Sequence, residues 1–171
     1  MKKRMLIRFL SLLILLQVFS SCQKEEGSAR LKAGESLVSF INCIQSSFED
    51  YDIPFSAEID DTSLQELFYI DPEDVEAYIG FYSRAITSVD NLLAVQAKEG
   101  KIERILSGMQ QRQEDLKANF KEYLPAQYEK ACAGQIVTKG DFAVFILLGD
   151  LQSDWNAQYQ QAKEQIASLF Q

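Results

Sequence analysis

The sequence predicts an α+β domain with a mostly antiparallel sheet of four strands and the long helices packed on one face of the sheet. Apolar residues recur every three or four positions over 101–123 and 151–170, as they do in amphipathic helices. They alternate with polar residues over 75–82, as in a half-buried strand. After the N-terminal helices, the elements follow the order strand, strand, long helix, and this order occurs twice.

The first part of the domain is expected to be helical and then irregular. A helix starts at Glu35, because its apolar residues share one helical face: Leu37, Phe40, Ile41, Ile44 and Phe48. Pro54 disfavours a continuous helix in the acidic stretch 49–61, which we expect to be irregular. Asp61 or Thr62 would cap a short helix over 63–68.

Two strands and the longest helix should follow. In VEAYIGFYS (75–83), alternation directs Val75, Ala77, Ile79 and Phe81 toward one face and the tyrosines toward the other. NLLAVQAK (91–98) is the second strand, and the helix over 101–123 ends before Pro125.

The last elements are a hairpin and a helix. QIVTKGDFAVFILLGD (135–150) has a turn around Gly140, which tolerates a positive φ. FAVFILL (142–148) is apolar on both faces, which indicates a central strand. Asp150 is the expected N-cap of the final helix. Residues 35–171 should therefore form a single α+β domain without needing a metal or a disulfide.

The N-terminus has the features of a bacterial export signal. MKKRMLIRFLSLLILLQVFSSC begins with cationic residues, continues with an apolar run over 9–19, and ends with Ser20 and Ser21 before Cys22. The apolar run is too short for a membrane-spanning helix, which needs about 20 apolar residues. We therefore expect residues 1–21 to be a removable signal peptide, with a signal anchor as the alternative.

The stretch VFSSC resembles the lipobox of bacterial lipoproteins, in which the cysteine thiol takes a diacylglycerol and becomes the new N-terminus. The resemblance covers 19–22, and Phe19 stands where leucine is usual. It implies lipidation of Cys22, followed by a flexible tether over 22–34. The expected location is the extracytoplasmic face of the cell membrane, or the outer membrane or cell surface if the cell has two membranes.

Charge argues against nucleic acid as a partner. The whole chain has a net charge of −8. Residues 1–22 contain four of the 17 basic residues and none of the 25 acidic ones, so the remaining chain carries −12. Proteins bind nucleic acid by neutralising its phosphates with lysine and arginine, and a strongly acidic body is unsuited to this.

Three stretches resemble a bacterial family of short lipoproteins, found mainly in Gram-positive species, whose domain has no assigned function. They are YIDPEDVEAYIGFYS, AITSVDNLLAVQAKEGKIERILSGMQQRQEDLKANF and FKEYLPAQYEKACAGQIVTKGDFAVFILLGD, and the likeness spans roughly 64–148. The resemblance implies a lipid-anchored envelope protein. It implies no catalytic residues.

The chain has no histidine, which removes Ser-His-Asp and Cys-His mechanisms and the commonest zinc ligand. Residues 33–83 contain 12 acidic residues and no lysine or arginine. This segment is interpreted first as a solvated acidic face. The alternatives are docking of a basic partner, a carboxylate pair for glycan hydrolysis, and a calcium site built from Asp50, Asp52, Glu58, Asp60 and Asp61.

Two further sets of residues are candidates. Cys43 and Cys132 remain once Cys22 is acylated, and they are either a disulfide or small buried thiols. Tyr78 and Tyr82 share one strand face and are either an exposed aromatic patch or part of the core.

We therefore expect a membrane-anchored lipoprotein with a non-catalytic extracytoplasmic domain that binds a protein or envelope ligand without a cofactor or metal. The alternative hypothesis is an envelope hydrolase that uses a carboxylate pair.

Overall fold

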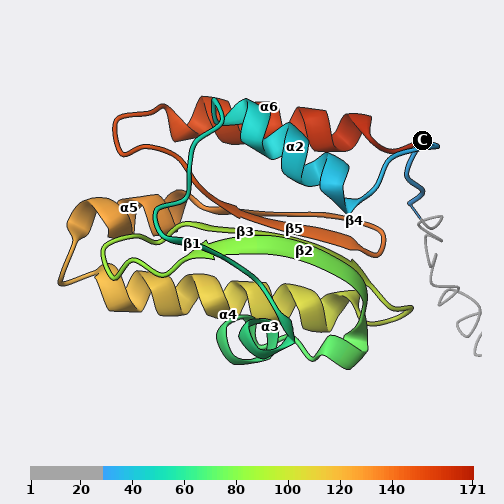
Figure 1. Ribbon diagram of the computed structural model, residues 1–171, viewed down its shortest axis with the longest axis horizontal. Helices are drawn as coiled ribbons and strands as arrows, with labels where there is room; N and C mark the ends of the chain where they lie inside the picture. Colours follow the sequence, from blue (N-terminus) through green and yellow to red (C-terminus); the bar gives the residue numbers. More distant parts are fainter. Residues whose placement is uncertain (1–28) are drawn as a thin grey trace, which may run out of the picture.

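The computed structural model describes residues 29–171 and has a single antiparallel sheet between two layers of helices (Figure 1). Its elements, in chain order, are α2 (Leu37–Ser47), β1 (Ser56–Glu58), α3 (Asp61–Phe68), the 3-10 helix η1 (Pro72–Asp74), β2 (Val75–Ser83), β3 (Asn91–Ala97), α4 (Ile102–Phe120), α5 (Pro125–Ala133), β4 (Gln135–Lys139), β5 (Phe142–Leu147) and α6 (Trp155–Ser168). The strands lie in the order β1-β2-β3-β5-β4. The predicted α+β class and antiparallel sheet are confirmed.

Helices cover both faces of the sheet. α2 and α6 pack on one face, whereas α3 and α4 pack on the other (Figure 1). Alternate residues of the central strands enter two separate cores: Leu93 and Phe145 join the α3–α4 layer, and Leu92 and Ile146 join the α2–α6 layer. The prediction that both long helices share one face is therefore wrong. β3 and β5 are apolar on both faces, so each long helix has its own apolar surface to cover.

β5 is a central strand, as its continuous apolar run predicts. It pairs with β3 on one side and with β4 on the other. All six of its residues are buried. The β4–β5 hairpin turns at Gly140, which has a φ of 58°. The hairpin prediction is confirmed.

The sheet has five strands, and the prediction of four omitted β1. β1 lies within the acidic stretch that we expected to be irregular, and Ser56 pairs with Ser83 of β2. It is only three residues long and sits at the edge of the sheet. A strand this short carries too little alternation to be recognised in a sequence.

An irregularity in the pairing of β2 with β3 changes which side chains share a face. The register shifts between Val75 and Ala77. Because a one-residue insertion reverses the alternation, Val75 faces the α3–α4 layer, whereas Ile79 and Phe81 face the α2–α6 layer. The predicted common face for these residues is wrong at Val75.

Two N-caps differ from the predictions, and one helix was not predicted. The N-cap of α3 is Asp60, whose Oδ1 accepts from the backbone N–H of Ser63 at 2.8 Å. The N-cap of α6 is Asp154 rather than Asp150. α4 ends at Phe120, before Pro125 as predicted, and Pro125 is the first residue of the additional helix α5, where its missing N–H has no helical partner to lose.

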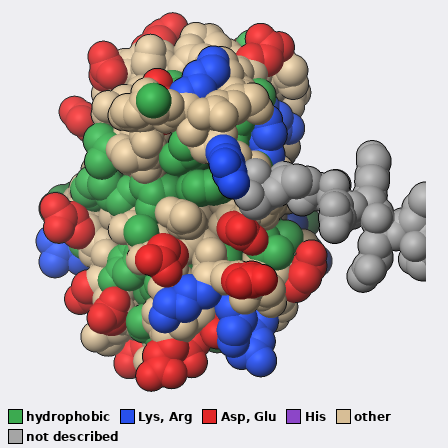
Figure 2. Space-filling model, turned by 90° about the vertical axis from the view of Figure 1, so that its right-hand side faces the viewer, with side chains coloured by type: hydrophobic (Ala, Val, Ile, Leu, Met, Phe, Trp, Pro, Cys, Tyr) green, Lys and Arg blue, Asp and Glu red, His purple; other side chains and the backbone are tan. Residues whose placement is uncertain are grey.

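The first described residues lie beside the C-terminus, at one end of the sheet (Figure 1). The backbone N–H of Lys32 donates to the carbonyl of Leu169 at 2.9 Å. Ala29 lies against Gly140 in the β4–β5 turn. Residues 30–32, which we assigned to the tether, therefore already belong to the folded domain. Figure 2 views this end: hydrophobic side chains form a band across its middle, with charged side chains of both signs around it.

Candidate functional site

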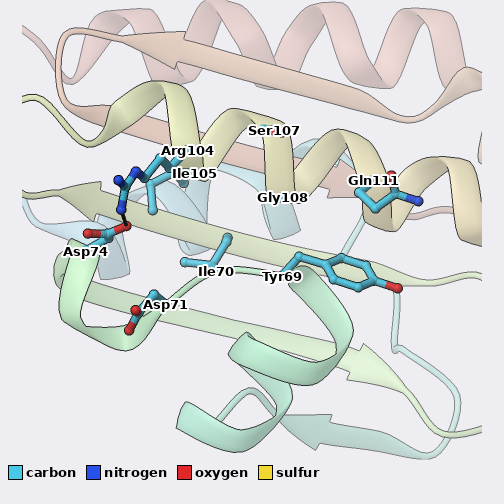
Figure 3. A pocket seen from close by; sticks show the side chains of 9 residues that line it. All are labelled: Tyr69, Ile70, Asp71, Asp74, Arg104, Ile105, Ser107, Gly108 and Gln111. Atoms are coloured by element: carbon cyan, nitrogen blue, oxygen red, sulfur yellow. Dashed lines mark hydrogen bonds and ion pairs between the residues drawn. The ribbon is translucent and has the colours of Figure 1, made fainter.

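A groove of about 440 Å³ runs between α4 and the segment that joins α3 to η1. Figure 3 shows its walls: one is the exposed side of α4, and the other is the turn after α3. It is lined by Tyr69, Ile70, Asp71, Asp74, Arg104, Ile105, Ser107, Gly108 and Gln111. Its volume lies within the range of small-ligand sites in proteins. We refer to it below as the α3–α4 groove.

Gly108 sets how closely the two walls approach. A Cβ atom at this position would lie 2.4 Å from the carbonyl oxygen of Phe68 and 2.8 Å from Cγ1 of Ile70. Glycine is therefore required here for close approach rather than for its backbone angles. The contact holds the turn after α3 directly against α4.

Tyr69 forms one end of the groove and has an unusual conformation. It lies immediately after α3 with a φ of 57°, in the left-handed region where glycine or asparagine is usual. Its side chain is 54% exposed. Its hydroxyl donates to Oδ2 of Asp115 on α4 at 2.5 Å, and this hydrogen bond raises the pKa of Tyr69. Tyr69 is thus exposed while its hydroxyl is held by Asp115, and Figure 3 shows its ring at one end of the groove.

Asp74 lies at the opposite end and is neutralised by two cations. Its carboxylate accepts from Nζ of Lys101 at 2.6 Å and from an N–H of Arg104 at 3.1 Å. These hydrogen bonds hold the pKa of Asp74 below its usual value. A carboxyl group that stays ionised cannot deliver a proton to a leaving group, so Asp74 does not suit the role of a general acid in hydrolysis.

A second feature is a buried ion pair at the opposite end of the sheet from Ala29. Lys130 of α5 donates to Oδ1 of Asp90, and each side chain is 1% exposed. Oδ2 of Asp90 accepts from the hydroxyls of Ser88 at 2.5 Å and Tyr51 at 3.1 Å. Burial lowers the pKa of Lys130 and the Asp90 carboxylate opposes that shift, whereas burial and then Asp90 raise the pKa of Tyr51. We call these four residues the Asp90 network.

The Asp90 network joins three segments that are distant in the sequence. Tyr51 belongs to the loop before β1, Ser88 to the β2–β3 loop, and Lys130 to α5. The backbone N–H of Val89 also donates to Oε1 of Gln127 on α5, at 3.1 Å. The two loops are thereby fixed to each other and to α5.

Each of these two loops exposes one large apolar side chain. Phe55 is 78% exposed and Ile86 is 80% exposed. The loops are hydrogen-bonded to each other: the N–H of Arg84 donates to the carbonyl of Phe55 at 3.2 Å, and the hydroxyl of Ser83 donates to the carbonyl of Pro54 at 2.5 Å. We refer to this surface as the Phe55–Ile86 tip.

A family model described as "Domain of unknown function (DUF4358)" matches residues 44–148, which is more than half of the chain. The chain belongs to this family. The α3–α4 groove, the Asp90 network and the Phe55–Ile86 tip all lie within the matched part of this DUF4358 protein, whereas α6 lies outside it. No curated protein and no solved structure matches the chain. The expected membership of a family without an assigned function is confirmed, and lipidation stays a prediction.

The structure brings together neither the two predicted cysteines nor an exposed aromatic patch. Cys22 lies outside the described residues. Cys43 on α2 is half-buried and Cys132 on α5 is exposed; both are free thiols, so no disulfide joins them.

Tyr78 and Tyr82 are half-buried against the α3–α4 core rather than exposed. The Tyr78 hydroxyl donates to Asp61 at 2.6 Å, and burial followed by this contact raises its pKa to about 12.

The acidic segment does not form a compact set of ligands. Among residues 29–171, no group of three or more carboxylate or thiol side chains is arranged to hold a metal ion. Asp60 is used as a helix cap, and its hydrogen bonds with Ser63 lower its pKa. The same part of the chain contains no helix that is both long and apolar enough to cross a bilayer.

Sequence reasoning did not identify Tyr69, the Asp90 network or the Phe55–Ile86 tip. One feature of the sequence could have indicated that Lys130 faces the interior. It lies next to apolar Ala131 and follows Gln127 by three positions, on one helical face. Its partner Asp90 is 40 residues away in the sequence, however, so nothing local indicates the pair.

Proposed function

We propose that this DUF4358 protein is a membrane-anchored bacterial lipoprotein whose non-catalytic extracytoplasmic domain docks a protein partner at the Phe55–Ile86 tip. The acylated thiol of Cys22 would be the anchor. One observation carries the docking part of the proposal: two almost fully exposed apolar side chains lie on hydrogen-bonded loops, at the sheet end opposite to Ala29.

The position of the tip relative to the first described residues supports this arrangement. Ala29 lies at the β4–β5 turn, where β5 begins, and the tip loops adjoin the other end of the sheet, where Leu147 of β5 pairs with Asn91 of β3. Ala29 follows Cys22 by seven positions, and a fully extended chain of this length spans at most roughly 25 Å. An anchor at Cys22 would therefore hold the Ala29 end near the bilayer and leave the tip projecting away from it.

The charge at the Ala29 end is compatible with a nearby bilayer. Lysine and arginine side chains lie on this face together with acidic ones (Figure 2). A uniformly acidic face would be repelled by anionic lipid head groups, whereas basic side chains are attracted to them. The mixed charge therefore supports close approach of this end to the membrane.

Two features of the tip are unfavourable for stability, and a loop with only a structural role would not need them. Phe55 has a φ of 48°, a conformation that is unfavourable for a bulky residue and is associated with functional sites when it occurs. The Asp90 network beneath it buries two charges, and a buried ion pair rarely adds net stability over an apolar pair of similar size. Both features are accounted for if the loops must keep one conformation for recognition.

The surroundings of the tip define the chemistry of its partner. Glu49, Asp50 and Asp52 are exposed on the loop that leads to Phe55, whereas Arg84 is the exposed cation beside Phe55 on the β2–β3 loop, so carboxylates outnumber cations among these residues. A second copy of this chain and an anionic lipid surface would both be repelled by these carboxylates. We therefore propose a partner protein that has an apolar socket bordered by lysine or arginine side chains.

Photo-crosslinking in the native cell tests this surface. A photoreactive phenylalanine analogue would replace Phe55 or Ile86, with replacement of Val38 on α2, which is 51% exposed, as the control. We expect the same adduct from positions 55 and 86 and its absence from position 38. Identical adducts from all three positions, or none from 55 and 86, would contradict docking at the tip.

A further inference from the structure

We infer that the α3–α4 groove binds an uncharged oligosaccharide, with Tyr69 as the platform for one sugar ring. This site lies apart from the tip described above. The groove combines a fixed aromatic face with a set of polar groups that can both donate and accept hydrogen bonds. Sugars present the matching chemistry, since they carry an apolar C–H face and hydroxyl groups around the ring edge.

The aromatic platform is held rigidly. The Tyr69 hydroxyl is engaged by Oδ2 of Asp115, and the other oxygen of Asp115 accepts from Nε2 of Gln111 at 2.8 Å. The hydroxyl at the polar edge of the ring is thus satisfied by the protein, whereas Tyr69 remains 54% exposed at the end of the groove (Figure 3). A rigid ring loses little conformational entropy when a ligand stacks on it.

The backbone at Tyr69 indicates that the ring itself is needed there. Glycine or asparagine usually occupies the left-handed position that ends a helix, because a larger side chain crowds the backbone. Tyr69 takes this conformation and still exposes half of its side chain, so burial does not compensate for the cost. Strained residues of this kind cluster at sites that clamp ligands.

The polar groups of the groove suit hydroxyl partners. Gln111 uses its amide nitrogen on Asp115, which leaves its carbonyl oxygen as an acceptor. Ser107 is exposed on the same side of α4, one turn away, and can both donate and accept. Arg104 binds Asp74 through one nitrogen and has further N–H groups. These side chains lie along α4 from one end of the groove to the other (Figure 3).

The charge and the walls of the groove argue against two other classes of ligand, namely anions and extended peptides. Lys101 and Arg104 are balanced by the carboxylates of Asp74 and Asp71, so the groove has no net positive charge that would favour phosphate or an acidic polymer over an uncharged ligand. The walls are a helix and a turn rather than a sheet edge, so an extended peptide could not add as a strand. An uncharged glycan is the class that uses both the aromatic face and the polar groups.

Saturation-transfer NMR on the full chain in mild detergent tests the inference. The probes are triacetylchitotriose, cellotriose and maltotriose, with the anionic trigalacturonate for comparison. We expect saturation transfer to at least one neutral probe and a weaker signal for trigalacturonate. Tyr69→Gly, which keeps the backbone conformation and removes the ring, should weaken binding by roughly tenfold, because an aromatic contact of this kind corresponds to about one order of magnitude in Kd.

Tyr123→Ala is the matched control, because Tyr123 is 62% exposed and lies between α4 and α5, outside the groove. This variant should bind as the wild type does, and circular dichroism would verify that both variants are folded. The inference is overturned if no neutral probe receives saturation, if trigalacturonate binds as well as the neutral probes, or if Tyr69→Gly and Tyr123→Ala behave alike. None of these results bears on crosslinking at Phe55, so the two proposals fail independently.

Discussion

Lys130 of α5 donates a hydrogen bond to Asp90, the residue immediately before β3, and both side chains are almost completely buried. The contact joins residues 40 positions apart and lies beneath the two loops that expose Phe55 and Ile86. A buried ion pair thus supports the two most exposed of the large apolar side chains among residues 29–171.

Removing one partner of this pair should be strongly destabilising. Lys130→Met leaves the Asp90 carboxylate buried without a cation, and we expect a loss of about 3–5 kcal/mol in the free energy of unfolding, measured by urea denaturation. The double variant Asp90→Asn, Lys130→Met removes both charges and keeps an acceptor for Tyr51 and Ser88. It should be more stable than Lys130→Met alone.

Lys117→Met is the matched control for this prediction. Lys117 pairs with Glu114 on the surface of α4 at 2.8 Å, and exposed pairs contribute at most about 1 kcal/mol. Equal losses from Lys117→Met and Lys130→Met would show that the Asp90 network is not a special support of the fold.

Gly108→Ala should destabilise the protein although alanine is the better helix former. The gain in helix propensity is about 1 kcal/mol, but the new Cβ would lie 2.4 Å from the Phe68 carbonyl oxygen, a backbone atom that cannot rotate away. We expect a net loss of roughly 1–2 kcal/mol by thermal or urea denaturation. The control is Ser107→Ala, one residue earlier and exposed, which should change stability little. If Gly108→Ala were more stable than the wild type, the close packing of the turn after α3 against α4 would be contradicted.

The ion pairs of Asp74 should make stability depend on pH in the acid range. Because Lys101 and Arg104 lower the pKa of Asp74 in the folded protein, their contribution is complete above the unfolded-state pKa of about 4 and is lost as the pH falls through the lower folded value. Asp74→Asn should therefore be less stable than the wild type at pH 6–7, and the difference should shrink below about pH 4. The free energies of unfolding are measured by urea denaturation, with Glu76→Gln on the surface of β2 as the control. A difference between the wild type and Asp74→Asn that is constant from pH 7 to pH 2 would contradict this role of Asp74.

Tyr69 should tolerate glycine better than alanine. Both substitutions remove the hydrogen bond to Asp115, but only glycine relieves the left-handed backbone conformation. We expect the melting temperature of Tyr69→Gly to exceed that of Tyr69→Ala by roughly 2–4 °C. The opposite order would show that the backbone at Tyr69 is not strained.

Several elements could be predicted because their signals are local. β5 is a continuous apolar run, α4 has a long apolar stripe, and the turn at Gly140 needs a positive φ. The side of the sheet that each helix covers depends instead on contacts between distant elements. Both faces of β3 and β5 are apolar, which allows one helical layer or two, and the sequence alone does not distinguish them.

The candidate sites were less predictable for the same reason. Tyr69 follows a short helix, and its left-handed conformation lies where the turn after α3 packs against Gly108 on α4, a contact between elements that are distant in the sequence. Tyr78 was a candidate for an exposed patch because β2 was expected to have a solvent face, but the α3–α4 layer covers that face. Pairings such as Asp90 with Lys130 appear only once three separate segments have been brought together.

Metabolic labelling with an alkyne analogue of palmitate tests directly whether Cys22 holds this protein on the membrane. The wild type, Cys43→Ser and Cys132→Ser should all incorporate the label and sediment with the membrane fraction. Cys22→Ser should incorporate none. Label retained by Cys22→Ser, or a wild type that takes up no label, would contradict anchoring through Cys22.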